Sequence, residues 1–163
     1  MAARVLVAYA TKMGSTGEIA EAIAEVLRSA GHDASAAPVR SVRGLEGWDA
    51  VVLGSALYAA HWQRDANRFV IRHLAALQAR PVWLFSSGPL DRRLAAANLP
   101  IAPHAEEIVA AVGYRGHRTF GGRLDPEAPG IDAQTLATHQ VGDFRDWTAI
   151  REWAGSIARD LGA

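Results

Sequence analysis

The sequence predicts an α/β fold in which helices cover both faces of a doubly wound, five-stranded parallel sheet. Short apolar segments alternate along the chain with amphipathic segments of helical period. No internal repeat or low-complexity tract interrupts this alternation. For five strands in a doubly wound arrangement the expected strand order is 2-1-3-4-5, which puts ligands at the carboxyl ends of the first and third strands.

Five apolar segments of strand length are predicted to form the sheet. They are residues 5–9, 33–37, 50–54, 82–86 and 118–123. Helical patterns lie between them, and strands that alternate with helices pair in parallel. The loops after the first, third and fourth strands are therefore expected to form the ligand site.

The first helix is predicted over residues 15–30. Its apolar residues Ile19, Ile23 and Leu27 recur every four positions, while charged residues occupy the other faces. Gly31 follows where glycine commonly ends a helix, because glycine adopts a positive φ freely. The apolar stripe of this helix is expected to pack against the sheet.

Three further helices are predicted. They cover residues 65–78, residues 103–112, and the C-terminal segment that begins after Asp146. Pro103 suits the start of the second of these helices, and Gly113 suits its end. Asp146 suits an N-cap, because its carboxylate can accept hydrogen bonds from the first free N–H groups.

Residues 125–142 are the main segment without a clear period. They include Pro126, Pro129 and Gly130, and we expect an ordered or mobile loop here rather than a domain boundary. The 163 residues, 1–163, are then predicted to form a single domain with a core of its own.

Composition narrows the possible functions. The formal net charge is zero, so bulk charge gives no reason to expect binding to nucleic acid or to an anionic membrane. The chain has no cysteine, which excludes iron–sulfur ligation, so redox activity requires a bound cofactor. The histidines show no close helical pairing, and no metal site is expected. No apolar stretch approaches the ~20 residues of a transmembrane segment and no signal peptide is visible, so we expect a cytoplasmic protein.

The most informative segment follows the first predicted strand, where the apolar run stops abruptly. It consists of Thr11, Lys12, Met13, Gly14, Ser15 and Thr16. The start of a helix carries unpaired N–H groups and the positive end of the helix dipole, so it attracts anions. Hydroxyl groups add donors, and glycine lets the backbone approach a ligand closely. The segment therefore predicts a binding site for a phosphate monoester.

Several other kinds of site are excluded because the motifs that define them are absent. The nucleotide loops GxxxxGK[ST] and GxGxxG are both absent, as is the GxSxG nucleophile elbow. A response-regulator receiver would need acidic residues after the first strand and an Asp at the end of the third. The chain has Thr11-Lys12 and Gly54-Ser55 at those places. An ordinary strand-to-helix turn with capping serine and threonine stays open as the alternative.

The loop of residues 11–16 resembles the FMN phosphate loop of flavodoxins, whose pattern is [ST]-x-x-G-x-T. The likeness is strongest to the flavodoxin-like menaquinone-dependent protoporphyrinogen oxidases, which have a basic residue second and Glu-Ile-Ala afterwards. Here Lys12 and Glu18-Ile19-Ala20 take those places. Actinobacterial flavodoxin-domain proteins are also similar. The resemblance spans nearly the whole chain and implies a flavodoxin-like fold with FMN as cofactor.

The loop after the third strand is similar to the oxidase family's Gly-x-Ser-Ile-Arg-Tyr-Gly-His-aromatic run. His61 and Trp62 keep the ending of that run, whereas Tyr58 stands at the arginine position. Ala59 and Ala60 replace Tyr-Gly, and alanine resists a positive φ more than glycine does. In the family this loop forms one wall of the flavin pocket.

The resemblance implies cofactor contacts in this loop and in the loop after the fourth strand. The first set, expected to meet the ring edge through backbone amides, is Ala56, Leu57, Tyr58 and Ala59. The second set, expected at the other edge of the ring, is Ser86, Ser87, Gly88 and Pro89. Tyr58 or Trp62 is expected to stack on the flavin, or Trp62 packs under the following helix instead. A plain turn is the alternative for the second loop.

The resemblance implies an FMN-dependent oxidoreductase of the protoporphyrinogen oxidase type, with a role in heme biosynthesis. Electrons would pass from a small-molecule substrate, such as a porphyrinogen, to a quinone or a redox protein. The flavin is the reactive group, with His61 and Tyr58 as the nearest acid–base candidates. The segment before the last helix is shorter and more acidic than the family's basic, aromatic insert. That departure weakens the expectation of contact with porphyrin or membrane.

Three other functions stay open. A flavodoxin-type electron shuttle has the same cofactor, but such carriers are typically acidic and this chain is neutral. A deazaflavin would fit the same phosphate loop. A partner-binding module that has lost FMN is a further possibility, against which the intact loop of residues 11–16 argues.

Overall fold

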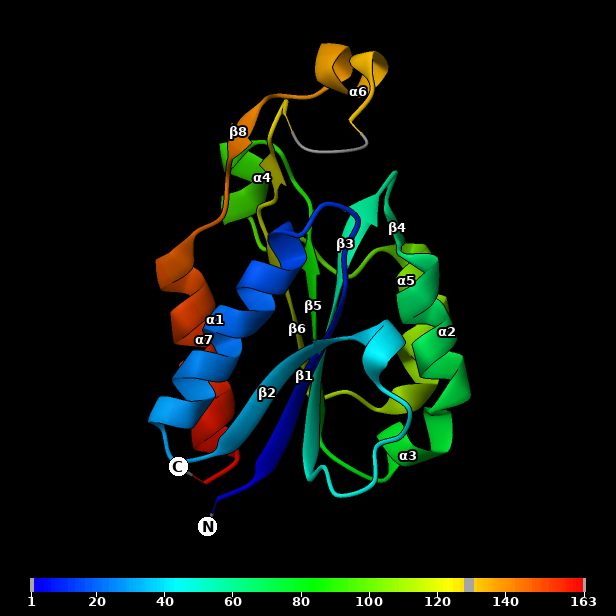
Figure 1. Cartoon of the computed structure of the whole chain (residues 1–163), viewed down its shortest axis with the longest axis vertical. Coiled ribbons are helices and arrows are strands. Elements are labelled where there is room, and N and C mark those ends of the chain that lie inside the picture. Colours follow the sequence, from blue (N-terminus) through cyan, green and yellow to red (C-terminus); the bar gives the residue numbers. More distant parts are fainter. Residues whose placement is uncertain (1, 128–130, 163) are drawn as a thin grey trace.

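The computed structural model, which describes residues 2–127 and 131–162, has a parallel sheet between two layers of helices (Figure 1). The sheet strands are β1 (Arg4–Ala10), β2 (Asp33–Pro38), β3 (Ala50–Tyr58), β5 (Val82–Ser87) and β6 (Gly116–Phe120). They adjoin in the order β2-β1-β3-β5-β6, and every pair is parallel. Counted over the five predicted strands, this is the order 2-1-3-4-5, so the predicted fold is confirmed.

The helices form two layers (Figure 1). One face of the sheet is covered by α1 (Ser15–Ser29) and α7 (Trp147–Asp160), the other by α2 (Arg64–Arg72), α3 (Leu74–Gln78) and α5 (Pro103–Val109). Alternate side chains of each strand enter the two cores, because successive residues of a strand point to opposite faces. In the described part of the chain, no helix is both long and apolar enough to cross a membrane.

The helix predicted over residues 15–30 is confirmed as α1. Ile19, Ile23 and Leu27 are fully buried against the sheet and α7, and Gly31 has a φ of 98°. The apolar stripe expected from the sequence is therefore the face of α1 that packs against the sheet.

Two of the other predicted helices are interrupted. Residues 65–78 form α2 and α3 rather than one helix, because the backbone leaves the helical region at His73 (φ −110°, ψ 20°). Residues 103–112 form α5 followed by a 3₁₀ turn, η2 (Ala110–Val112), which ends at Gly113 with a φ of 74°. The C-terminal helix is confirmed, and the Asp146 carboxylate accepts from the Ala149 N–H as predicted.

The strand predicted over residues 118–123 is wrong at both ends. β6 begins at Gly116 and stops at Phe120, and the chain then crosses another segment at Gly121. A Cβ on Gly121 would lie 2.0 Å from the Phe144 carbonyl oxygen, so the two backbones touch there. The chain leaves the main sheet at this crossing and continues as β7 (Arg123–Leu124), which pairs antiparallel with β8 (Gly142–Asp143).

The expectation of an irregular segment over residues 125–142 is also wrong in part. It contains the helix α6 (Ala133–Thr138), whose first turn is capped by the Asp132 carboxylate, and it ends in β8. Residues 128–130, which include Pro129 and Gly130, lie outside the described residues. Three short elements have no counterpart in the sequence prediction: η1 (Val39–Ser41), β4 (His61–Trp62) and α4 (Arg92–Ala96).

The hairpin that joins β3 to β4 contains a strained turn. Ala59 and Ala60 have φ values of 50° and 61°, a region in which L side chains crowd the following carbonyl. Two central residues with positive φ define a type I′ turn, which favours Asn-Gly. Alanine at both positions therefore costs stability to keep the hairpin closed.

Replacing Ala60 with glycine should raise the free energy of unfolding by about 1 kcal/mol, because the left-handed conformation no longer meets a Cβ. Urea unfolding of the variant measures this. Ala75→Gly, at an exposed helical position in α3, is the matched control and should lower stability by about 0.5–1 kcal/mol. Equal losses in both variants would contradict the strained turn.

Candidate functional site

The site is positioned by the register of three adjacent strands. Ala10 at the end of β1 is paired with Ser55 of β3, and Ser55 is paired with Ser86 of β5. Because these strands are parallel, their carboxyl ends lie at one edge of the sheet, and the loops that follow them emerge side by side. Residues from all three predicted loops meet at this edge.

The loop after β1 ends in an open helix start. Gly14 is the N-cap of α1, with a φ of 92° and no atom near its missing Cβ. Its N–H donates to the Thr11 hydroxyl at 2.9 Å, which folds the loop into a tight turn. No side chain caps the first N–H groups of this 15-residue helix. These N–H groups are available to an anion, and the positive end of the helix dipole lies at the same place.

The loop after β5 passes through a narrow gap between two other loops. A Cβ on Gly88 would lie 2.8 Å from the Leu57 Cβ, and a Cβ on Gly122 would lie 3.2 Å from the Gly88 Cα. The Gly88 N–H donates to the Phe120 carbonyl, and the Gly122 N–H donates to the Pro89 carbonyl. Glycine is needed here because a side chain would separate the loops.

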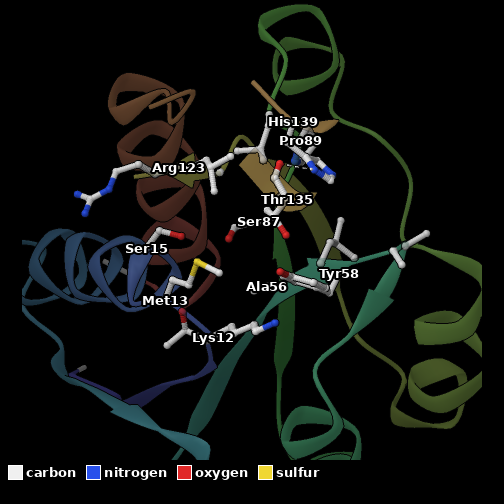
Figure 2. A pocket seen from close by; sticks show the side chains of 18 of the residues that line it. Lys12, Met13, Ser15, Ala56, Tyr58, Ser87, Pro89, Arg123, Thr135 and His139 are labelled. Atoms are coloured by element: carbon white, nitrogen blue, oxygen red, sulfur yellow. Dashed lines mark hydrogen bonds between the residues drawn. The ribbon is translucent and has the colours of Figure 1, made fainter. Parts of the chain in front are cut away.

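A cavity of about 480 Å³ opens between these loops (Figure 2). It is lined by Thr11, Lys12, Met13, Ser15, Ala56, Leu57, Tyr58, Ala59, Ala60, Ser87, Gly88, Pro89, Leu90, Leu94, Gly122, Arg123, Leu124, Thr135 and His139. Volumes of this size are typical of small-molecule and cofactor sites.

Eleven of the fifteen residues predicted for the site line this cavity: Thr11, Lys12, Met13, Ser15, Ala56, Leu57, Tyr58, Ala59, Ser87, Gly88 and Pro89. The other four are Gly14, which is exposed at the start of α1, and Thr16, Trp62 and Ser86, which lie behind the cavity wall. Thr16, Trp62 and Ser86 are all at least 97% buried. Their positions suit the support of the loops rather than direct contact with a ligand.

A cation lies against an aromatic ring at one end of the cavity. The Lys12 ammonium lies 4.0 Å from the centroid of the Tyr58 ring, so the loops after β1 and β3 touch through a cation–π contact (Figure 2). The Tyr58 side chain is 42% exposed, which leaves ring surface open to a ligand. Positive charge and an aromatic face therefore stand side by side where the loops meet.

Buried hydroxyl groups tie the three loops together beneath the cavity. The Thr16 and Ser87 hydroxyls are 2.9 Å apart and link the start of α1 to the end of β5. The Trp62 indole N–H donates to the Ser86 hydroxyl at 2.9 Å, and His117 Nε2 lies 2.9 Å from the same oxygen. Trp62 therefore packs in the core, in line with the alternative considered for it.

The environment of His117 favours its neutral form. Burial lowers the pKa of His117 to about 4, although the negative charge of Glu106 opposes part of this effect. Ser86 Oγ accepts from the Trp62 N–H, and its contact with His117 Nε2 can run in either direction, depending on the tautomer of the neutral imidazole.

An ion pair whose arginine is buried fixes the β7–β8 ribbon to the start of α1. The Arg145 side chain is 2% exposed and binds both carboxylate oxygens of Asp143, at 2.9 and 2.7 Å. It also donates to the Ser15 carbonyl and lies 3.4 Å from the Glu18 carboxylate. Hydrogen bonds from Arg145 lower the pKa of Asp143, so this pair stays ionised near neutral pH.

Sequence reasoning missed the outer wall of the cavity. Leu90 and Leu94 come from α4 and the loop before it, Gly122, Arg123 and Leu124 from β7 and its approach, and Thr135 and His139 from α6 and its end. Asp132 was a usable signal, because an aspartate three residues before Thr135 fits an N-cap. No local pattern could have shown that α6 returns to this cavity.

The fold and the cavity define a flavodoxin-like cofactor-binding domain. A model of the flavodoxin domain family matches residues 6–127, three quarters of the chain, and the chain belongs to this family. Family and fold together make it a flavodoxin-like, FMN-binding domain. The resemblance inferred from the loop of residues 11–16 is confirmed at this level.

The sequence identity to individual proteins is low. A protoporphyrinogen IX dehydrogenase [quinone] of Escherichia coli is 28% identical over 92 residues, which cover 55% of this chain and 51% of that protein. The chain thus matches about half the length of this curated relative. An archaeal flavodoxin superposes with a TM-score of 0.68 at 15% identity, covering 98% of this chain and 99% of the other. The rubredoxin oxygen:oxidoreductase of Desulfovibrio gigas gives 0.67 at 15% identity, over 98% of this chain and 37% of that one.

The buried imidazole predicts a loss of stability in acid. His117 has a pKa of about 4 in the folded protein and about 6.5 in an unfolded chain. Below pH 6.5 the unfolded state therefore binds the extra proton first, and stability is lost progressively as the pH falls from 6.5 to 4. After allowance for partial exposure, we expect this group to contribute about 2 kcal/mol to that loss.

His117→Gln tests this expectation, because the amide offers Ser86 both a donor and an acceptor but does not titrate. The free energy of unfolding, measured by urea denaturation at pH 7 and pH 4.5, should fall less in the variant than in the wild type. Loss of the Asp143–Arg145 pair contributes equally to both proteins. The same pH slope in the two would contradict the role assigned to His117.

Proposed function

We propose that this protein is an FMN-dependent oxidoreductase that passes electrons from a small-molecule substrate to a quinone or a redox-protein acceptor. One observation carries the proposal: a single cavity joins an uncapped helix start and Lys12 to an apolar, aromatic slot beside Tyr58. FMN has the matching two ends, a phosphate and a flat ring. When bound, it supplies the two-electron redox chemistry that the side chains lack.

The phosphate end is assigned to residues 11–16. The first N–H groups of α1, together with the Thr11 and Ser15 hydroxyls and the Lys12 ammonium, provide donors for a dianion. Gly14 leaves space for the phosphate because it has no Cβ. The Thr16 hydroxyl is paired with Ser87, so we assign Thr16 the task of holding the helix start against β5.

The ring end is assigned to the loops after β3 and β5. Backbone groups of residues 56–59 and of residues 87–89 flank the slot, and Tyr58 offers the aromatic face. Trp62 is only 3% exposed, so its contribution is to brace the hairpin from below through Ser86. The close packing of Gly88 against Leu57 fixes the width of the slot.

The substrate is assigned to the outer wall. Leu90, Leu94 and Leu124 make this wall largely apolar, which suits a planar, hydrophobic molecule laid over the ring. The name of the E. coli relative supports a porphyrinogen as substrate and a quinone as acceptor, and with them a role in heme biosynthesis. A cytoplasmic location is part of the same proposal.

A second candidate is a flavodoxin-type electron shuttle. It is favoured by the likeness of the fold to flavodoxins over 98% of this chain. A shuttle needs no substrate wall and works through an exposed ring edge. The two candidates therefore differ in whether a small substrate is oxidised without a protein partner.

Lys12→Gln should weaken FMN binding about tenfold and leave riboflavin binding nearly unchanged, because only FMN carries the phosphate that the ammonium pairs with. Fluorescence titration of the apo-protein with each flavin measures this. Arg151→Gln, an exposed change of equal charge on α7, is the control and should bind both flavins like the wild type. If Lys12→Gln weakened riboflavin binding as much as FMN binding, the assignment of the phosphate to Lys12 would be wrong.

The assignment of activity is tested with the FMN-loaded protein. Anaerobic mixing with protoporphyrinogen should reduce the flavin, and a water-soluble quinone should then restore its visible absorbance over repeated turnovers. Reduction by a protein donor alone, with no reaction toward the porphyrinogen, would favour the shuttle. Failure to bind either FMN or a deazaflavin would remove both candidates.

A further inference from the structure

A second, smaller cavity is lined by residues of η1 and α2. The helix α2 covers the face of the sheet opposite to α1 and α7 (Figure 1). The volume of this cavity is about 210 Å³, and it is lined by Val39, Arg40, Asp65, Arg68, Phe69 and Arg72. None of these residues lines the cofactor cavity. Val39 and Phe69 are 6% and 4% exposed and form an apolar floor, and the charged side chains surround it.

The charges around this cavity are unbalanced. Three guanidinium groups face a single carboxylate, and Asp65 is already engaged by the Arg40 Nε at 2.6 Å. Within residues 2–127 and 131–162, Arg68 and Arg72 have no hydrogen bond or ion pair, although both border the pocket. By contrast, Arg28 on α1 is paired with Glu21 at 2.6 Å. Two guanidinium forks are thus available to a ligand.

This arrangement is unfavourable for the helix itself. Arg64, Arg68 and Arg72 follow one another at a spacing of four residues, so their like charges lie on one face of α2 and repel. Asp65 is the only acidic residue in this helix, and its ion pair is with η1. Repulsion between arginines that no neighbouring carboxylate offsets is expected at a site where a ligand supplies the negative charge.

We propose that this pocket binds the phosphate or diphosphate group of a small phosphorylated molecule. Arg68 and Arg72 supply planar forks that match phosphate oxygens, and the two Nη groups of Arg40 supply a third set of donors. The free Asp65 oxygen suits a ligand hydroxyl beside the phosphate. The pocket has room for about seven waters at ~30 Å³ each, enough for a diphosphate but below the range of larger organic ligands. This site is independent of the flavin.

The test uses the full-length chain with pyrophosphate as the probe, followed by amide NMR shifts. Saturable shifts are expected in η1 and α2, apart from any in residues 11–16, where the cofactor phosphate is assigned. In Arg68→Gln/Arg72→Gln, the affinity at the α2 pocket should fall at least about tenfold, because each lost bond is to a charged group. Glutamine is a good helix former, so α2 should persist.

The matched control is Arg151→Gln/Arg159→Gln, which removes the same charge from the exposed face of α7. Its affinity for pyrophosphate at the α2 pocket should stay within about twofold of the wild type. Equal weakening in the two double variants would overturn the proposal, because it would indicate bulk charge. Shifts confined to residues 11–16 would also overturn the proposal, and so would binding only to vesicles of anionic phospholipid and not to free pyrophosphate.

Discussion

The carboxyl ends of β1, β3 and β5 lie in register at one edge of the sheet, and the rest of the site depends on this alignment. The pairings of Ala10 with Ser55 and of Ser55 with Ser86 bring loops separated by more than thirty residues into contact. A shift of a strand's register by one residue would turn every side chain of that strand to the other face of the sheet. The buried hydroxyls of Ser55 and Ser86 would then lose their partners, and the cavity would lose its floor.

Glycine and small hydroxyl side chains make this alignment rigid. Gly88 lies between Leu57 and Gly122, and Gly54 lies beneath the ring of Phe85, where a Cβ would be 2.0 Å from the Cζ atom. Thr16 and Ser87 then join two loops with a single buried hydrogen bond. Because buried polar groups are costly when unpaired, this network specifies one arrangement of the loops. A flat ligand slot can therefore exist before any cofactor arrives.

The order of the strands, the helix α1 and most of the cavity could be predicted because each depends on local pattern. A stripe with a four-residue repeat, an abrupt end to an apolar run and a Gly-Pro turn are all visible over a few residues. The strand expected to run to residue 123 shows the limit of this reasoning. Its second half leaves the sheet because Gly121 meets the backbone of Phe144, which is 23 positions away in the sequence. The outer wall of the cofactor cavity and the arginine pocket are likewise formed by segments that are distant in the sequence.

The sequence by itself determined the layered α/β architecture, the helix start that follows Gly14 and the absence of any cysteine-based redox chemistry. Only the tertiary structure decided which side chains face a ligand. In the folded protein Trp62 and Thr16 are buried behind the cavity, and Tyr58 lies against Lys12. The helix α6 contributes Thr135 to the cavity wall. The physical reason is that composition and period fix which residues are buried or form a helix, whereas orientation within a site depends on packing between distant segments.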